Sequence, residues 1–346
     1  MTQETHDRST RVLAALIREY IVTGEPVASA LLATAAGLGV SSATVRNILA
    51  RLEDEGYVQQ PHTSAGRIPT DRGYRVYVDL LLEAKRSDRT AIAVEALLRR
   101  DRSGSQPDSL LSQASHVVSQ ASRLVAFALR PAQGAAVFDR VEFIPISSGR
   151  VLVVIVARGG HVLQKVIDVN EPIGADELHQ AANYLNAEFA GLPLARAREA
   201  VLERIDEERL LCDALFARAM RLATSTFANL ADERMLYIEG TASLLGDAQG
   251  MTLGTLQILV QMIEEKQRLV RLLNEYIDGP GLTVVIGAEH PEPNLRSFSL
   301  VASTYEDAGG TGTIGVIGPT RMRYSRAIAV VDGAAQAVSR VLRDPN

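Results

Sequence analysis

The sequence predicts a protein of the α+β class with several domains. At about 150 residues per domain, its 346 residues suggest two or three of them. Apolar residues make up 47% of the chain and charged residues 22%, a composition typical of globular proteins rather than disordered ones. Apolar side chains recur at helical spacing in several segments, whereas residues 137–169 and 282–317 are rich in the Val and Ile that favour strands.

Three helices are expected at the N-terminal end. In residues 10–23 the apolar side chains recur with the period of a helix, and Gly24 ends it. A second short helix is expected over residues 29–36. A third, over residues 42–55, begins at a serine N-cap and ends before a glycine.

A β-hairpin is expected after the third helix. Residues 57–60 have the composition of a strand, and residues 61–69 combine a loop with a return strand. A further helix is predicted over residues 71–83, with Thr70 as its cap. Three helices followed by a hairpin form the outline of a winged helix-turn-helix, which we predict for residues 1–83.

The rest of the chain alternates between helical and sheet patterns. The predicted helices cover about residues 108–129, 175–230, 255–277 and 320–342. The predicted strands cover residues 137–146, 150–156, 162–169, 282–287, 296–303 and 312–317. Because ribbons of two or three strands are weak alone, we expect both groups of strands to share one sheet, with the helical block between them as an insertion.

The third helix is the first candidate for contact with nucleic acid. Its off-core polar side chains are Ser42, Thr44, Arg46, Asn47 and Arg51. A recognition helix places its first turns in the major groove, where Arg pairs with guanine and Asn with adenine. Hydroxyl groups and a helix N-terminus suit a phosphate. The alternative is a surface helix with ordinary capping, but the position between a helix and a hairpin favours recognition.

The hairpin and the following helix supply further candidates. The hairpin candidates are His62, Thr63, Ser64 and Arg67. Such a tip can lie along a phosphate backbone with its arginine in or beside the minor groove, or it can be a solvated hairpin. Arg72 and Arg75 would either contact phosphate or pair with nearby aspartates. The net charge gives no support for DNA binding, because residues 1–82 hold eight Arg, no Lys and nine Asp or Glu, a net of −1.

Other functions are excluded by missing motifs. One cysteine rules out an intrachain disulfide and a cysteine-based metal site, and the six histidines lack helical ligand spacing, so we expect no metal or cofactor. The glycine-rich run 310–315 lacks the Gly-Lys-Ser/Thr of a phosphate loop, and no nucleophile motif is present, so we expect no enzyme.

The longest apolar run, residues 151–157, is far below the roughly 20 residues of a membrane span. With no secretory signal visible, we expect a cytoplasmic protein without a membrane partner.

Three motifs resemble the heat-inducible transcription repressor (HrcA) family. They are residues 41–47 (Ser-Ser-Ala-Thr-Val-Arg-Asn), 61–70 (Pro-His-Thr-Ser-Ala-Gly-Arg-Ile-Pro-Thr) and 312–322 (Gly-Thr-Ile-Gly-Val-Ile-Gly-Pro-Thr-Arg-Met). The resemblance covers essentially the whole chain, and the ten-residue hairpin motif is its most specific part. Ala30 stands where the family usually has Lys, which would remove a phosphate contact.

The resemblance implies a repressor that binds double-stranded DNA at an inverted-repeat operator ahead of chaperone operons. A GroEL-type chaperonin would keep it competent, and heat stress would end repression. The implied domains are a DNA-binding domain (1–83), a GAF-like domain in two parts (84–171 and 251–346) and a mainly helical dimerising insertion (172–250). A two-fold operator also needs two recognition helices, so we expect a homodimer.

Two other functions stay open. One is an effector-sensing winged-helix regulator with a ligand pocket in the GAF-like domain. The other is a protein-interaction module that uses the winged helix as a scaffold.

Overall fold

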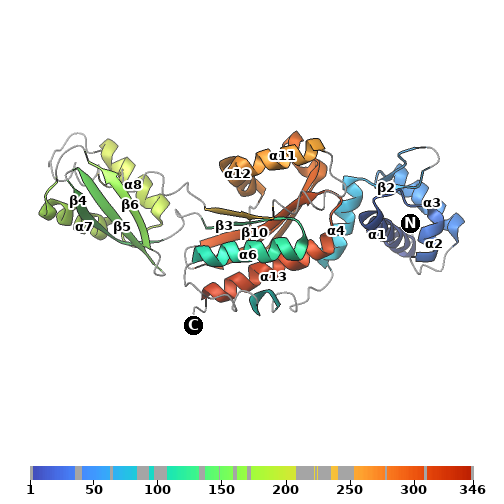
Figure 1. Ribbon diagram of the computed structural model, residues 1–346, viewed down its shortest axis with the longest axis horizontal. Helices are drawn as coiled ribbons and strands as arrows, with labels where there is room; N and C mark the ends of the chain where they lie inside the picture. Colours follow the sequence, from blue (N-terminus) through green and yellow to red (C-terminus); the bar gives the residue numbers. More distant parts are fainter. Residues whose placement is uncertain are drawn as a thin grey trace. The chain divides into compact units, whose positions relative to one another are not determined.

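The computed structural model describes most of the chain (Figure 1). The described residues are 3–35, 41–62, 65–83, 93–96, 107–131, 137–147, 149–158, 162–169, 173–207, 222, 224, 235–240, 253–276, 279–307 and 310–343. The chain divides into two compact units. The first comprises Met1–Ala128, Tyr237–Thr304 and Ile314–Val338, and the second Leu129–Leu236, Tyr305–Thr313 and Ser339–Asn346.

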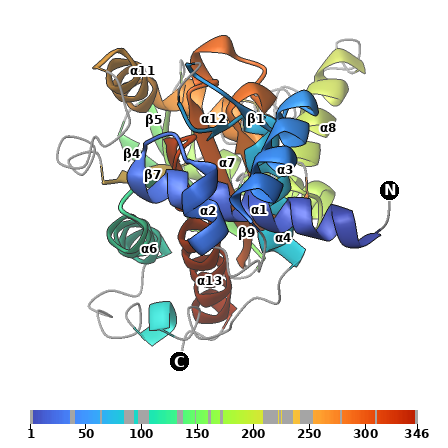
Figure 2. The ribbon, with the colours of Figure 1, turned by 90° about the vertical axis from the view of Figure 1, so that its right-hand side faces the viewer.

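The first unit begins with three helices and a hairpin. The elements are α1 (Gln3–Thr23), α2 (Ser29–Ala35), α3 (Ser42–Asp54), β1 (Val58–Gln59), β2 (Ile68–Pro69) and α4 (Asp71–Glu83). Figure 2 shows α1, α2 and α3 crossing one another. Their shared core is apolar: Val12, Leu16, Ile17, Leu32, Val45, Leu49 and Val78 are all at most 4% exposed. The predicted helices and hairpin are confirmed, with α1 beginning earlier than expected.

A third extended segment closes the base of the hairpin. The backbone N–H of Val27 donates to the carbonyl of Arg67, and the N–H of Arg67 donates to the carbonyl of Val27, both at 2.9 Å. This pair lies next to the antiparallel pairing of β1 with β2. A Cβ on Gly66 would lie 2.4 Å from the carbonyl of Val27, so only glycine permits this approach. The hairpin is thereby attached to the segment that precedes α2.

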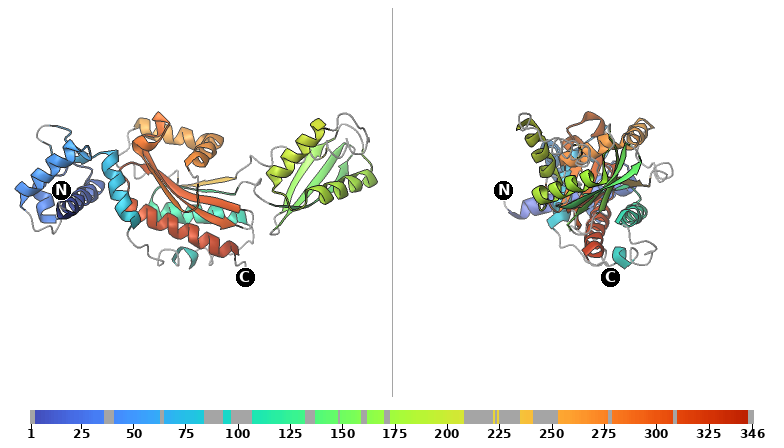
Figure 3. Two further views of the ribbon diagram at one scale, coloured as in Figure 1. Left: turned by 180° about the vertical axis from the view of Figure 1, so that it is seen from behind. Right: turned by 90° about the vertical axis from the view of Figure 1, so that its left-hand side faces the viewer.

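A five-stranded sheet lies mainly in the first unit, and its residues 305–307 and 310–313 are assigned to the second. Its strand order is β7–β3–β10–β9–β8. The strands are β3 (Val125–Leu129), β7 (Leu236–Glu239), β8 (Leu282–Ile286), β9 (Phe298–Asp307) and β10 (Gly310–Pro319). Helices α6 (Pro107–Ser122) and α13 (Tyr324–Arg343) cover one face, and α11 (Leu253–Glu264) and α12 (Lys266–Tyr276) cover the other (Figures 1 and 3). The short turns η2 (Gly287–Glu289) and η3 (Pro293–Leu295) connect β8 to β9.

Two helix predictions in this region are wrong in their extent. The helix expected over 108–129 ends at Ser122, and Arg123, with φ of 60°, leads into β3. All five residues of β3 are buried, so its apolar run shows no strand alternation and resembles a helix in sequence. The single helix expected over 255–277 is divided at Glu265 into α11 and α12. The short strand β7 was not predicted.

The second unit has a sheet of its own. Strands β4 (Phe138–Ser147), β5 (Arg150–Ala157) and β6 (Val162–Asp168) pair antiparallel in that order, and α7 (Ala175–Phe189) and α8 (Leu194–Glu207) follow. The expectation that all predicted strands share one sheet is therefore wrong. The physical reason is that side chains of both helices join one face of the three strands in a common core, which supports a small sheet.

The second compact unit contains residues that were expected in two different domains. Residues 137–169, expected in the first part of a GAF-like domain, lie in the same unit as α7 and α8. In the described part of the chain, no helix combines the length and apolar character needed to cross a membrane.

Candidate nucleic-acid interface

Helix α3 has one buried and one exposed face. Val45, Leu49 and Leu52 are buried against the N-terminal core. The exposed side chains are Ala43, Thr44, Arg46, Asn47 and Ala50. Apart from Thr44 these follow the i, i+3, i+4, i+7 spacing of one helical stripe. The helix therefore presents its first two turns to an approaching ligand.

The start of α3 is held by hydroxyl groups. Ser41 caps it by accepting the backbone N–H of Thr44 at 3.2 Å, and the two hydroxyls lie 3.0 Å apart. The hydroxyl of Ser42 lies 3.4 Å from that of Ser29, the first residue of α2. Ser42 is thus linked to the start of α2 and Thr44 to the cap of α3, while the N-terminus of α3 still offers its partial positive charge to a phosphate.

Three of the candidate arginines are held at the C-terminal end of α3. Arg67 pairs with Glu53 at 2.8 Å. Arg51 bonds Ser9 and lies 3.7 Å from a carboxylate oxygen of Glu55. Arg72 donates to the Glu55 carbonyl at 3.0 Å and stacks over Tyr57, 4.7 Å from the ring centroid. Each guanidinium therefore already has a partner within the N-terminal helices and hairpin.

Arg46 differs from these arginines. It is exposed, and in the described part of the chain it takes part in no ion pair. Asn47 lies beside it on the same exposed stripe. The structure thus leaves Arg46 and Asn47 exposed at the surface, whereas Arg51, Arg67 and Arg72 are bound to partners near the C-terminal end of α3.

The hairpin is braced from inside. The side-chain amide of Gln60 donates to the carbonyl of Ala65 at 3.0 Å, and the backbone N–H of Ala65 donates to the carbonyl of His62 at 2.8 Å. His62 is exposed. Thr63 and Ser64, also predicted as contacts, lie outside the described residues. The brace from Gln60 was not anticipated from the sequence.

Arg75 is engaged far from α3. Its Nε donates to Glu289 at 2.6 Å, and its Nη2 donates both to the other oxygen of Glu289 and to the carbonyl of Val284 at 2.6 Å. Asp79, one turn further along α4, lies 3.5 Å away. Of the two alternatives for this residue, pairing with an acidic side chain is the arrangement observed, although Glu289 was not foreseen as the partner.

Asp71 completes a joint between α4 and the turn after β8. It accepts the backbone N–H of Ala288 at 2.8 Å, and Gly287, with φ of +47°, brings its backbone so close that a Cβ would lie 2.2 Å from the Asp71 carboxylate. Tyr74, between the two charged residues, packs with its ring centroid 5.6 Å from that of Tyr324. We call Asp71, Tyr74 and Arg75 with their partners the α4 joint. The partners on the other side of the joint all lie more than 200 residues away in sequence, so no local pattern could have indicated it.

The described residues contain no group of three or more His, Cys, Asp or Glu side chains placed to hold a metal ion. Cys212 lies outside the described residues.

An exposed Arg–Asn stripe on the third helix, beside a braced hairpin, defines a candidate DNA-binding protein of the helix-turn-helix class. The family model for the HrcA protein C-terminal domain matches residues 108–328. The heat-inducible transcription repressor HrcA of Geobacter sulfurreducens is 37% identical over 338 residues, covering 97% of this chain and 98% of that protein. The repressor of the same name from Syntrophobacter fumaroxidans is 35% identical, covering 98% and 97%.

The chain belongs to the HrcA family of heat-inducible transcription repressors. A crystal structure described as that of a hypothetical protein has a similar fold, with a TM-score of 0.61 at 25% identity, covering 97% of this chain and 98% of that one. The named relatives are transcription repressors, a class of protein that is not enzymatic.

The α4 joint gives a prediction about stability. In a double-mutant cycle of Arg75→Met and Glu289→Gln, we expect each single change to destabilise the chain, because it leaves a partly buried charged group without its partner. The double variant should lose less free energy of unfolding than the two single variants added together. The expected coupling energy is about 1 kcal/mol, as for a partly exposed ion pair. Urea denaturation of the four proteins measures it. Strictly additive losses would show that the pair does not hold the joint.

Proposed function

We propose that the chain represses transcription by binding, as a homodimer, an inverted-repeat operator ahead of chaperone operons. Residues 1–83 would act as the winged helix-turn-helix domain. The observation that carries the proposal is the exposed stripe on α3 with Arg46 and Asn47 at its centre. Membership in a family of transcription repressors supports the same function.

The geometry suits direct reading of bases. Arg46 and Asn47 lie in the first two turns of α3, the part of a recognition helix that reaches base edges. Bidentate pairs of Arg with guanine and of Asn with adenine each discriminate by about 1–3 kcal/mol. Thr44 and the start of α3 would take a phosphate, and exposed His62 would lie along the backbone beside them.

Three acidic residues lie at the C-terminal end of α3: Glu53, the exposed Asp54 and the C-cap Glu55. Glu53 is paired with Arg67, and Glu55 lies beside Arg51. This pairing offsets local negative charge that would otherwise oppose a phosphate backbone, in a region whose net charge is close to zero. We infer that Arg51, Arg67 and Arg72 support the interface chiefly by shaping it, and that Arg75 serves the α4 joint.

Replacing Arg46 by Ala should weaken operator binding by about 10- to 100-fold, corresponding to the loss of one bidentate base contact. Binding to a scrambled duplex should change much less, because phosphate contacts carry no sequence information. Fluorescence anisotropy on both duplexes over a salt series measures this.

The matched control is Arg140→Ala, which removes an exposed arginine from β4 in the other compact unit. It should leave both affinities unchanged. If the Arg46 variant kept wild-type operator affinity, α3 would not be the recognition helix.

We place the dimer contact in the second compact unit. One face of its three-stranded sheet is covered by the core with α7 and α8, whereas the other keeps large apolar side chains exposed. They are Ile144 (45% exposed), Ile146 (50%), Val162 (52%) and Val166 (50%). The cross-strand register sets Ile144 opposite Leu152 and Leu152 opposite Val166, so that one apolar row crosses all three strands. Such a face matches a second copy of itself across a two-fold axis.

Val166→Lys tests this contact. The wild-type chain should sediment as a dimer, and the variant should raise the dimer dissociation constant at least tenfold, because it buries a charge in an apolar interface. The control is Val260→Lys, which changes an exposed valine of α11 (41% exposed) outside this unit and should remain dimeric. A Val166→Lys variant as dimeric as the wild type would move the interface elsewhere.

We also propose the remaining domain roles and the chaperonin link that the family resemblance implies. The five-stranded sheet with its helices would be the GAF-like domain, and the second compact unit its insertion. A GroEL-type chaperonin would keep the repressor folded, so that damaged proteins competing for it on heating would end repression.

The chaperonin link is tested by refolding. We expect the fraction of chains able to bind operator after dilution from urea to rise at least threefold with chaperonin and ATP, since small free-energy differences control the folded fraction. Chaperonin without ATP serves as the control. Equal active fractions in all conditions would contradict a chaperonin-dependent repressor.

A further inference from the structure

The C-terminal motif, residues 312–322, contains an arginine that the sheet itself does not explain. The glycines of the motif serve packing inside the sheet. A Cβ on Gly312 would overlap the ring of Tyr305, and a Cβ on Gly315 would lie 2.6 Å from the carbonyl of Val301. Arg321, in contrast, lies beyond the end of β10, in the turn that leads to α13, and is only partly buried.

The guanidinium of Arg321 lies against the C-terminal end of α1. A Cβ on Gly24 would overlap its Nη1 atom and lie 2.8 Å from its Cζ atom, so a side chain at residue 24 would displace it. Gly24 has a φ of 75° and donates its N–H to the carbonyl of Tyr20 at 2.8 Å, as glycines at helix ends do. The C-terminal end of a helix carries partial negative charge, which favours a cation at this position.

The turn that carries Arg321 is fixed to the five-stranded sheet. The N–H of Thr320 donates to the carbonyl of Ser297 at 3.3 Å, and the hydroxyl of Tyr324 donates to the carbonyl of Thr320 at 2.8 Å. Tyr324 is fully buried, and its hydroxyl also lies 2.7 Å from that of Ser299 in β9. Because the turn is held at several points, the position of the sheet determines the position of Arg321.

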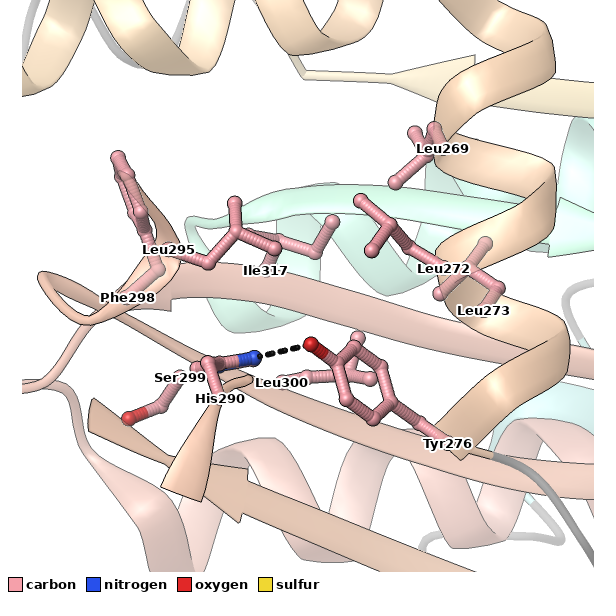
Figure 4. Close-up of a pocket in the computed structure, with 10 residues that line it drawn as sticks. All are labelled: Leu269, Leu272, Leu273, Tyr276, His290, Leu295, Phe298, Ser299, Leu300 and Ile317. Carbon is pink, nitrogen blue, oxygen red and sulfur yellow. Dashed lines mark hydrogen bonds between the residues drawn. The ribbon is translucent and has the colours of Figure 1, made fainter. Parts of the chain in front are cut away.

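The α4 joint is a second attachment of the N-terminal helices to the same sheet. Its turn η2 is held from behind, because the Nδ1 atom of His290, which directly follows η2, lies 3.1 Å from the hydroxyl of Tyr276 at the end of α12 (Figure 4). Burial raises the pKa of Tyr74 in the joint, and the charge of Arg321 lowers it in part, so the two attachments lie close together. One contact would leave a hinge, whereas contacts at both α1 and α4 fix an orientation.

The segment after Gly24 leads directly to the candidate interface. Three residues further on, Val27 pairs with Arg67 at the base of the hairpin. The hydroxyl of Ser29, at the start of α2, lies 3.4 Å from that of Ser42, the first residue of α3. A displacement of Gly24 would therefore displace both the hairpin and the start of α3.

We propose that Arg321 is a positioning residue for operator binding. Together with the α4 joint it fixes the direction in which the N-terminal helices present α3, and thereby the separation of half-sites that the dimer accepts. This role rests on the proposed function, because the two half-sites of an operator must match the two recognition helices of a dimer. Arg321 acts through Gly24 rather than on the DNA. Its loss would leave each α3 able to bind one half-site but would weaken simultaneous binding of two.

The test compares the wild-type chain with Arg321→Met, which removes the charge from a side chain of similar length. The matched control is Arg323→Met, which changes an exposed arginine two residues further along the same turn. Fluorescence anisotropy measures the affinity of each full-length protein for the operator, for a duplex with one half-site, and for operators with spacers one or two base pairs shorter or longer. A scrambled duplex reports nonspecific binding.

We expect the wild-type chain and Arg323→Met to bind the natural spacing at least tenfold more tightly than the altered spacings. Arg321→Met should keep its half-site affinity within twofold, bind the operator at least fivefold more weakly, and lose most of the preference between spacings. A variant that was merely less stable would have a lower active fraction on every duplex, and its spacing preference would be unchanged.

Gly24→Asn disturbs the same contact from the side of α1. Asparagine tolerates the positive φ of this position, but its Cβ would displace the guanidinium of Arg321. We expect it to weaken the spacing preference as Arg321→Met does, so the test does not depend on the folding of a single variant.

Two results would overturn the role of Arg321: a wild-type chain that accepts all spacings equally, or variants at Gly24 and Arg321 that keep the wild-type spacing preference. A wild-type chain that binds the operator no better than the scrambled duplex would contradict the proposed function and, with it, this role.

Discussion

Helix α4 packs into two different cores, and the attachment of the N-terminal helices to the five-stranded sheet depends on it. Tyr77 and Val78 are buried on the side where α4 contacts α1. One turn earlier, Tyr74 packs on Tyr324 and Arg75 forms a two-point hydrogen bond with Glu289. Bidentate arginine–carboxylate pairs fix orientation as well as distance, so α4 has little freedom to turn. A displacement of the turn after β8 would therefore displace α4, the helix that follows the hairpin.

The arrangement of the arginines follows from a shortage of positive charge. Residues 1–82 contain fewer basic than acidic side chains, and no lysine. Three arginines bind acidic or carbonyl groups at the end of α3. These contacts offset negative charge there and hold the hairpin against the helix. Arg46 then stands at the exposed stripe without a competing partner in the described part of the chain. Specific contacts, rather than a broad positive field, would have to supply the affinity for DNA.

Local patterns predicted the N-terminal elements well. The period of apolar side chains, the serine cap and the glycine stops located α2, α3 and α4 within one or two residues, because each signal lies within a few residues of its effect. The strands of the second unit were found for the same reason. The pairing of strands into two separate sheets was not predicted, because it depends on which face of the strands the helices α7 and α8 cover. Strand β3 was missed since a fully buried strand lacks the alternation that identifies a strand in sequence.

For the candidate interface, the sequence by itself determined which residue types stand at the start of α3 and in the hairpin, and hence the class of ligand they suit. Only the tertiary structure decided which of the candidate side chains remain available, because ion pairs such as Arg67 with Glu53 and Arg75 with Glu289 join different elements of the fold.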